Sequence, residues 1–164
     1  MDLFKKIKLK FEEVNFSTDY SILPEKWKVK DDFEAFFVHP NAASLDGIVL
    51  DKPLIFLTKK DYRLIFHELG HYVGTILNRR SIAYLKTAKS NKNYTYNSNK
   101  YDNYEEAVAE FTAHFLLSHF GKDDENNLTQ TLFYIEDLKL NKRDKMKAQK
   151  EALKASKYII ERLK

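Results

Sequence analysis

The stretch RLIFHELGHYVG, residues 63–74, carries His67 and His71 four residues apart, with Glu68 directly after the first. On an α-helix this spacing places two imidazoles about 40° apart around the axis and about 6 Å apart along it, so both can bind one zinc ion. Glu68 lies beside the pair, where its carboxylate can take a proton from a zinc-bound water that attacks a carbonyl. The residues predict a hydrolytic zinc centre. The alternative is a helix with two histidines hydrogen-bonded in a core.

Two histidines are too few for a catalytic zinc site, which needs three protein ligands and one open position. The pattern continues as H-E-x-x-H-x-x-G as far as Gly74. Three residues later stands Leu77, where the metzincin pattern has a histidine. The third ligand must therefore come from another part of the chain.

A second segment, residues 104–121, reads YEEAVAEFTAHFLLSHFG. It offers Glu106, Glu110 and His114, which are spaced by four and so share one helix face. We predict that Glu106 is the third ligand and that Glu110 orients a ligand histidine, while the reverse assignment stays open. His114 is a weaker alternative ligand. Glu105 points about 100° away and is expected to be solvated.

The oxyanion of a hydrolytic reaction would also need a donor. Three residues are candidates, and the sequence does not choose among them: Tyr104, His114 and Arg79. The remaining histidines, His39 and His119, show no partner in the sequence and are expected at the surface.

Length and composition set the wider limits. The 164 residues, 43% of them apolar, suit one domain over residues 1–164 with a substantial core, and the absence of cysteine leaves only histidines and carboxylates to hold a metal. The net charge of +4 allows weak affinity for an anionic partner, although a solvated Lys-rich surface explains it more simply. We find no signal-peptide pattern and no membrane-spanning run, and expect a cytoplasmic protein without membrane contact.

Hydrophobic periodicity indicates the elements that must position the site. Residues 58–78 predict a helix in which Thr58 and Asp61 form a capping box. Residues 104–121 predict a second helix that ends at Gly121, and residues 128–140 predict a third. The apolar faces are assigned to Ile65, Leu69, Tyr72, Val73 and Ile76 in the first helix, to Val108, Phe111, Phe115 and Leu116 in the second, and to Met146, Leu153, Ile160 and Leu163 in a final helix.

The predicted strands are shorter than the helices. Residues 33–40 predict one strand, residues 45–57 predict one or two, and residues 3–14 fit either a strand or a helix. Residues 86–103 are polar and predict a long loop. Its interleaved lysines and tyrosines could bind single-stranded nucleic acid, although a loop of biased composition is the simpler interpretation.

Four stretches carry a resemblance to a known family: FFVHPNAASLDGIVL, YRLIFHELGHYVGTILNRR, YEEAVAEFTAHFLLSHFG and YIEDLKLNKRDKMKAQKEALKASKYI. Together they cover about residues 33–163. They resemble the zincin-like metallopeptidase domain of ArdC-type antirestriction proteins, a gluzincin-like group. The resemblance implies an α+β fold in which a small, mostly antiparallel sheet packs on the HExxH helix, a glutamate helix and C-terminal helices. It also implies that His67, His71 and Glu106 bind the metal.

The leading hypothesis is a zinc-dependent metallopeptidase of a mobile genetic element or phage. Glu68 would be the general base, Zn²⁺ the cofactor, and an extended protein or peptide the substrate, paired with a strand at LDGIVL or PLIFL. His and carboxylate ligands could also take manganese, nickel or cobalt. The alternatives are a non-proteolytic, DNA-associated antirestriction accessory protein, a structural zincin without catalysis, and a repressor-cleaving peptidase, since FHELGHYV also resembles ImmA/IrrE-type enzymes.

Overall fold

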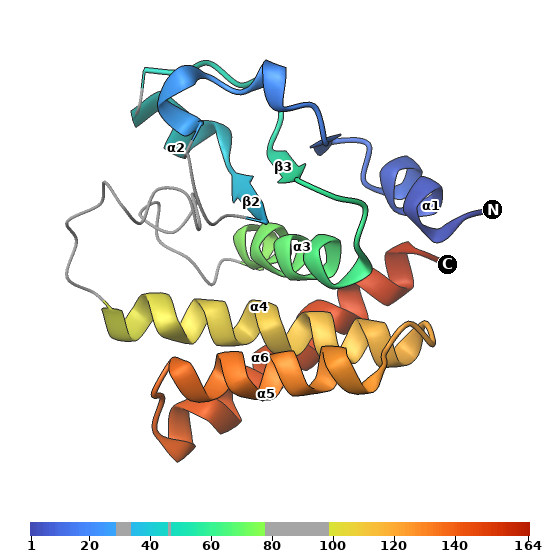
Figure 1. The fold of residues 1–164 in the computed structure, drawn as a ribbon, viewed down its shortest axis with the longest axis vertical. Helices are drawn as coiled ribbons and strands as arrows, with labels where there is room; N and C mark the ends of the chain where they lie inside the picture. Colours follow the sequence, from blue (N-terminus) through green and yellow to red (C-terminus); the bar gives the residue numbers. More distant parts are fainter. Residues whose placement is uncertain (29–33, 46, 78–98) are drawn as a thin grey trace.

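A computed structural model describes residues 1–28, 34–45, 47–77 and 99–164 and shows an α+β fold. Figure 1 shows a small sheet at one side of α3 and the remaining long helices at the other. No helix in these described ranges is long and apolar enough to cross a membrane. The elements are α1 (Leu3–Lys10), β1 (Asn15–Ser17), η1 (Tyr20–Ile22), η2 (Glu25–Trp27), β2 (Ala35–Val38), α2 (Pro40–Leu45), β3 (Leu54–Leu57), α3 (Tyr62–Ile76), α4 (Asn99–His119), α5 (Glu125–Asp137) and α6 (Lys142–Arg162).

The sheet has three strands in the order β1-β3-β2. β2 is antiparallel to β3, with Phe37 opposite Ile55, whereas β1 is parallel to β3, with Phe16 opposite Ile55. The expectation of a mostly antiparallel sheet is therefore wrong, because β1 comes from a three-residue segment that periodicity cannot detect. β3 is central and paired on both edges, so the predicted addition of a peptide at PLIFL is excluded. In the LDGIVL stretch, residues 47–50 form no strand.

Both faces of the sheet are buried, and alternate residues face opposite sides. Towards α3 the sheet contributes Ala35, Phe37, Ile55 and Leu57. On the other face a separate cluster is closed by η2 and α2, with Leu23, Trp27, Phe36, Val38, Ala43, Leu54 and Phe56. The α3 side also receives α1, whose Phe4 and Ile7 are buried. The ambiguous N-terminal segment is therefore a helix that belongs to the core.

The predicted helix of the HExxH motif is present, but its start differs from the expectation. Asp61 caps α3 by accepting a hydrogen bond from the Leu64 backbone N at 3.1 Å. Thr58 is not part of the cap, because its hydroxyl donates to the Glu34 carbonyl at 2.7 Å instead. The predicted apolar face is confirmed: Ile65, Leu69, Tyr72 and Val73 are buried, and Ile76 packs against the same cluster.

α3 and α4 approach each other unusually closely at Gly70. A Cβ atom at this position would lie 3.1 Å from the Ala109 Cα and 3.3 Å from the Thr112 Cβ. A side chain at this position would require the neighbouring residues of α4 to move by a few tenths of an ångström, so Gly70 allows the close approach of the two helices. The helix pair carries all the predicted metal-binding residues, and the separation of their side chains depends on this contact.

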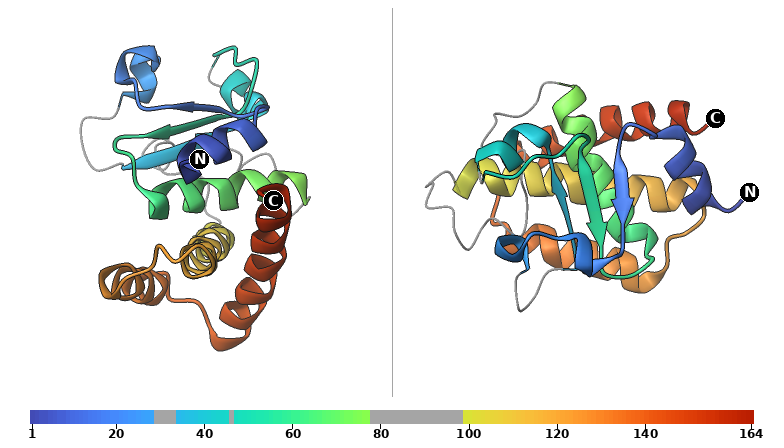
Figure 2. Two further views of the ribbon diagram at one scale, coloured as in Figure 1. Left: turned by 90° about the vertical axis from the view of Figure 1, so that its right-hand side faces the viewer. Right: turned by 90° about the horizontal axis from the view of Figure 1, so that it is seen from above.

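α4 lies between α5 and α6, as both views of Figure 2 show. α6 presents a face of small residues to the core, with Ala148, Ala152, Ala155, Ser156 and Ile159 buried. The predicted apolar face was partly wrong: Met146 is 52% exposed and Leu153 55% exposed, whereas Leu163 is buried. The alanines, which weigh little in a hydrophobicity pattern, are the residues that pack on α4.

Two further predictions concern the ends of α4. Gly121 adopts a positive φ of 63° directly after the helix, as expected for a glycine that ends one. The predicted loop at residues 86–103 is wrong for its last five residues, because α4 already begins at Asn99. The rest of that loop lies outside the described residues.

Candidate metal centre

Three predicted ligands meet at the interface between α3 and α4. The Nε2 atoms of His67 and His71 are 3.2 Å apart. Glu106 bridges them, with Oε2 at 3.1 Å from the His67 Nε2 and Oε1 at 3.0 Å from the His71 Nε2. These three residues form a group whose possible ligand atoms all lie within 4.8 Å of one another. The two helices therefore bring two nitrogens and one carboxylate to a single point.

The spacing of this group fits zinc. In a tetrahedral site with metal–ligand bonds of about 2.0–2.1 Å, neighbouring ligand atoms are about 3.3 Å apart. The two Nε2 atoms are 3.2 Å apart, close to that value, and each of them has a different Glu106 oxygen at 3.1 or 3.0 Å. A zinc ion here would be held by the two imidazole nitrogens and the Glu106 carboxylate, and a site with three protein ligands would keep a further position for water or substrate.

Glu110 contacts the opposite edge of the His67 ring. The His67 Nδ1 donates to the Glu110 Oε2 at 2.8 Å. The other Glu110 oxygen accepts from the Arg63 guanidinium at 2.7 Å and from the Thr131 hydroxyl at 3.0 Å, and the carboxylate is fully buried. Because Nδ1 carries the donated proton, the Nε2 lone pair of a neutral His67 faces Glu106 and His71.

The sequence left open which glutamate would be the ligand and which the partner. The geometry separates them: Glu106 reaches the Nε2 atoms of both histidines, and Glu110 reaches only Nδ1 of His67. A carboxylate on the second nitrogen of a ligand histidine is the arrangement that orients such ligands. The structure therefore places the two glutamates in positions that match the predicted ligand and partner.

The charges of this cluster hold each other in their ionised forms. Burial lowers the pKa of His67, but hydrogen bonds with Glu106 and Glu110 outweigh it and raise the pKa to about 10. Burial raises the pKa of Glu110, yet His67 and Arg63 bring it down to about 2. For Glu106 the same competition ends with a pKa well below the usual value. Without metal, His67 is thus an imidazolium between two carboxylates, and its proton supplies the positive charge a metal would supply.

Glu68, the predicted general base, lies on α3 between the two histidines and is buried, with 4% of its surface exposed. Its charge reaches Tyr134 on α5: burial, then Glu106 and Glu110, and then Glu68 raise the pKa of that phenol. Glu68 is therefore a buried carboxylate close enough to Tyr134 to affect its pKa.

Tyr134 had no role predicted from the sequence. Its hydroxyl donates to the Glu106 Oε2 at 2.8 Å, and its ring meets the His67 ring edge-on with centroids 6.1 Å apart. Arg63 and Thr131 were also missed. A local signal existed, because Arg63 precedes His67 by four residues, and Thr131 and Tyr134 are polar positions three apart in an amphipathic helix. Their partners, however, lie on other helices.

Other predicted residues are not part of this group. His114 is half-buried, lies against the Phe115 ring and is absent from the group that could hold a metal. Tyr104 is half-buried beneath the Lys147 ammonium, which is 5.6 Å from its ring centroid. The third oxyanion candidate, Arg79, lies outside the described residues. Glu105 was expected to be solvated, but only 2% of it is exposed, because α4 is packed on several sides.

The two histidines expected at the surface differ. His119 is exposed at the end of α4. His39 is only half-buried, and its Nδ1 accepts a hydrogen bond from the Asn41 backbone N at 3.1 Å. Burial lowers the pKa of His39, which favours the neutral ring that accepts this bond.

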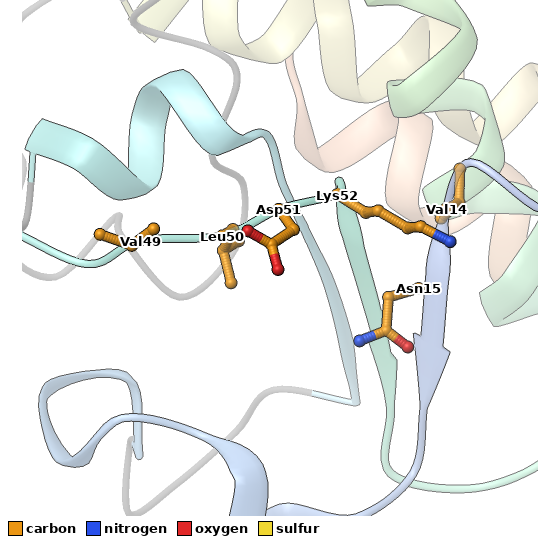
Figure 3. Close-up of a pocket in the computed structure, with 6 residues that line it drawn as sticks. All are labelled: Val14, Asn15, Val49, Leu50, Asp51 and Lys52. Atoms are coloured by element: carbon orange, nitrogen blue, oxygen red, sulfur yellow. The ribbon is translucent and has the colours of Figure 1, made fainter.

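A pocket of about 500 Å³ adjoins the candidate metal centre. Arg63 and Tyr134 belong to both, and the pocket is otherwise lined by Glu34, Lys59, Asp61, Leu64, Asn127, Gln130, Phe133 and Asp137. A second pocket, of about 440 Å³, lies at the start of β1 and is drawn in Figure 3. Its lining contains Asp51 and Lys52 but no histidine. Of these two pockets, the first is the one that shares residues with the surroundings of the histidines.

Comparison of the chain with protein-family models, with curated proteins and with solved structures gives no match in any of the three.

Proposed function

We propose that the chain is a zinc-dependent metallopeptidase with a zincin-like fold, as the ArdC-type resemblance implies. The observation that carries the proposal is the convergence of His67, His71 and Glu106, which each offer one ligand atom within 4.8 Å of the others. Two histidines and one carboxylate are a donor set of catalytic zinc sites, which keep a fourth position open. The proposed setting, in a mobile genetic element or phage and in the cytoplasm, rests on the resemblance and on composition.

Each residue then has a separate task. Zinc, when bound by His67, His71 and Glu106, would polarise a carbonyl and lower the pKa of a water molecule. Glu68 accepts the proton of the attacking water and returns it to the leaving amine. Glu110 keeps the His67 ring in one tautomer, as its 2.8 Å contact with Nδ1 supports.

Tyr134 completes the surroundings of Glu106 in this proposal. Its hydroxyl fixes one carboxylate oxygen at 2.8 Å, and its side chain lines the adjoining pocket. An extended substrate would enter beside Tyr134 and Arg63. Among the described residues β2 pairs only with β3, so the other edge of β2 replaces PLIFL as the place where a peptide strand could be added.

A competing function is a structural one. The imidazolium of His67 between Glu106 and Glu110 satisfies the cluster without metal. This is the second interpretation that the sequence allowed, in which the histidines are hydrogen-bonded in a core. It requires the protein to carry no zinc and to cleave nothing.

Metal content and peptide cleavage test the proposal together. Metal is measured by mass spectrometry, and cleavage with a proteome-derived peptide library whose new termini are identified, which needs no known substrate. Wild type should carry zinc and cleave, His67→Ala and Glu106→Ala should lose both, and Glu68→Gln should keep zinc and lose cleavage. His119→Ala, at an exposed site on the same helix as Glu106, is the matched control. Wild-type protein that takes up no added zinc would support the structural function instead.

A further inference from the structure

The outward face of α6 carries a continuous row of positive charges. Five exposed residues follow each other at intervals of four, three, four and three: Arg143, Lys147, Lys150, Lys154 and Lys157. On an α-helix this spacing keeps all five on one side and extends the row over about 21 Å. The opposite side of α6 packs on α4 (Figure 2), so the row faces away from the core, except that the Lys147 ammonium lies 5.6 Å from the centroid of the Tyr104 ring on α4.

Positive charges outnumber negative ones on α6, whose acids are the half-buried Asp144 and Glu151 and the exposed Glu161. Within the described residues, Arg143, Lys150, Lys154 and Lys157 form no ion pair, whereas Lys145 and Lys164 each contact a glutamate, at 2.8 and 2.7 Å. Glu161, beyond the end of the row, is the exposed acid on α6. Like charges three and four residues apart destabilise a helix. A helix face of mixed charge would avoid this cost, so the row points to a binding partner.

The partner must be anionic and extended. A bilayer surface fits poorly, because an amphipathic helix binds membranes by inserting its apolar side, and that side of α6 is buried against α4. The apolar side chains exposed on α6 are Met146 and Leu153. A nucleic acid strand is a linear polyanion whose phosphates a row of cations can neutralise, with release of counterions.

We propose that the outward face of α6 binds the phosphate backbone of nucleic acid without reading its sequence. The side chains of the row are long, flexible cations, which suit phosphate contacts. This binding is separate from the proposed peptidase function, because four of the five residues lie on the face of α6 that turns away from α4. The fifth, Lys147, contacts Tyr104, which is not part of the group that could hold a metal. It also does not need the polar segment at residues 86–98.

Fluorescence polarisation with a labelled DNA duplex of about 20 base pairs tests the proposal, since the row spans about 6 base pairs at 3.4 Å per pair. The full chain should bind, and log K should fall with log salt between about 50 and 200 mM with a slope of up to about −4.5, from five phosphate contacts. One strand of this duplex, tested alone as single-stranded DNA, should give a slope of up to about −3.5. No binding by wild type at about 50 mM salt, or binding that ignores salt, would overturn the proposal.

Variants locate the surface. Lys150→Gln, Lys154→Gln and Lys157→Gln together should reduce the duplex slope by about 2.7 and weaken binding at low salt at least about tenfold. A variant with arginine at the same three positions should bind the duplex as wild type does. Glu161→Gln should tighten it.

The matched control removes three exposed lysines from α1, Lys5, Lys8 and Lys10. Changing these three lysines to glutamine lowers the net charge as much as the triple variant of α6 does. It should leave the salt dependence of duplex binding unchanged. Equal losses in the α6 and α1 variants would show that total charge binds the DNA and would overturn the assignment to α6. Binding to phosphatidylserine vesicles without binding to DNA would overturn it as well. Unchanged melting temperature and zinc content in each variant exclude misfolding as the cause.

Discussion

The two long interfaces of α4 are built in opposite ways. Towards α6, α4 meets a surface of small apolar side chains, with Ala148 and Ala152 completely buried. The buried Ser156 hydroxyl on α6 is satisfied within that helix, because it donates to the Ala152 carbonyl at 2.7 Å. Towards α3, α4 buries Glu106 and Glu110 against His67, His71 and Arg63.

The two interfaces differ in how much their burial contributes to the free energy of folding. Apolar burial stabilises an interface directly. Burying ions costs desolvation that their attraction only partly offsets, so apolar side chains of equal size often do as well or better. A protein that closes one side of α4 with alanines could close the other side likewise. The proposed metal binding would account for the charged cluster.

The largest expected effect is a loss of peptide cleavage without a loss of zinc binding at the interface between α3 and α4. Glu68→Gln should retain zinc but lower peptide cleavage by about 10²–10⁴-fold, because the general base is lost while the three ligands remain. Cleavage rate and metal content are measured on the same preparation. Glu161→Gln, an exposed acid on α6, should change neither. Undiminished cleavage by Glu68→Gln would sink the assigned mechanism.

Removing one partner of the buried cluster should destabilise the protein strongly. Glu110→Leu leaves the Arg63 and His67 charges without their shared carboxylate, so the free energy of unfolding should fall by about 3–5 kcal/mol. Urea denaturation of the metal-free protein measures it. On the other side of α4, Ile159→Val should cost only about 0.5–1.5 kcal/mol. Similar losses from both variants would contradict the contrast drawn between the interfaces.

Loss of the Tyr134 hydroxyl should weaken metal binding moderately. Tyr134→Phe keeps the ring against His67 but frees one Glu106 oxygen, and partners of this kind change metal affinity by about 10–100-fold. Competition with a coloured zinc chelator measures the affinity. Phe133→Ala, next along α5 and 69% exposed, should leave it unchanged. Equal affinity in Tyr134→Phe and wild type would remove Tyr134 from the site.

Zinc affinity should rise with pH. The pKa of about 10 means that metal-free His67 holds a proton at neutral pH, and zinc must displace it. One displaced proton gives about a tenfold rise in affinity per pH unit, up to a pH of about 10. Glu110→Gln should flatten this dependence, and His119→Ala should not. Isothermal titration at several pH values, in buffers of different ionisation enthalpy, counts the proton released.

The same pKa shifts give the metal-free protein a stability window. His67 has a pKa raised from 6.5, so its contribution is complete below that value and is lost as the pH rises towards 10. Glu110 has a pKa lowered from 4.5, so its contribution is complete above that value and is lost as the pH falls towards 2. The melting temperature of the metal-free protein should therefore fall when the pH drops below about 4.5 and when it rises above about 6.5. A profile unchanged by Glu110→Gln would contradict this.

The smallest expected effect is the loss of stability when the distance between α3 and α4 is increased. Gly70→Ala forces the helices apart at the Ala109 backbone and should cost about 1–3 kcal/mol of unfolding free energy, with weaker zinc binding. Ala152→Gly, at the buried interface with α6, should cost about 0.5–1 kcal/mol and leave zinc affinity unchanged. Denaturation and chelator competition measure both. Tight zinc binding in Gly70→Ala would show that the ligand geometry tolerates a wider spacing.

The secondary structure was predictable where the signal is local and long. The helix of the HExxH motif and the strand at Ala35–Val38 follow from apolar residues at regular intervals, and both are present. The three-residue strand β1 was missed, because it is too short to show a period. The apolar face of α6 was assigned to Met146 and Leu153 in place of its alanines, because periodicity ranks large side chains above small ones that pack closely.

By itself, the sequence determined that His67 and His71 share one helix face and that Glu106 and Glu110 share another, since these relations depend only on the rise and turn of an α-helix. Tertiary structure alone decided which glutamate meets which nitrogen. It also supplied Arg63, Thr131 and Tyr134 as the partners of those glutamates. The reason is that contacts between helices depend on their separation and rotation, which here follow from the close approach at Gly70.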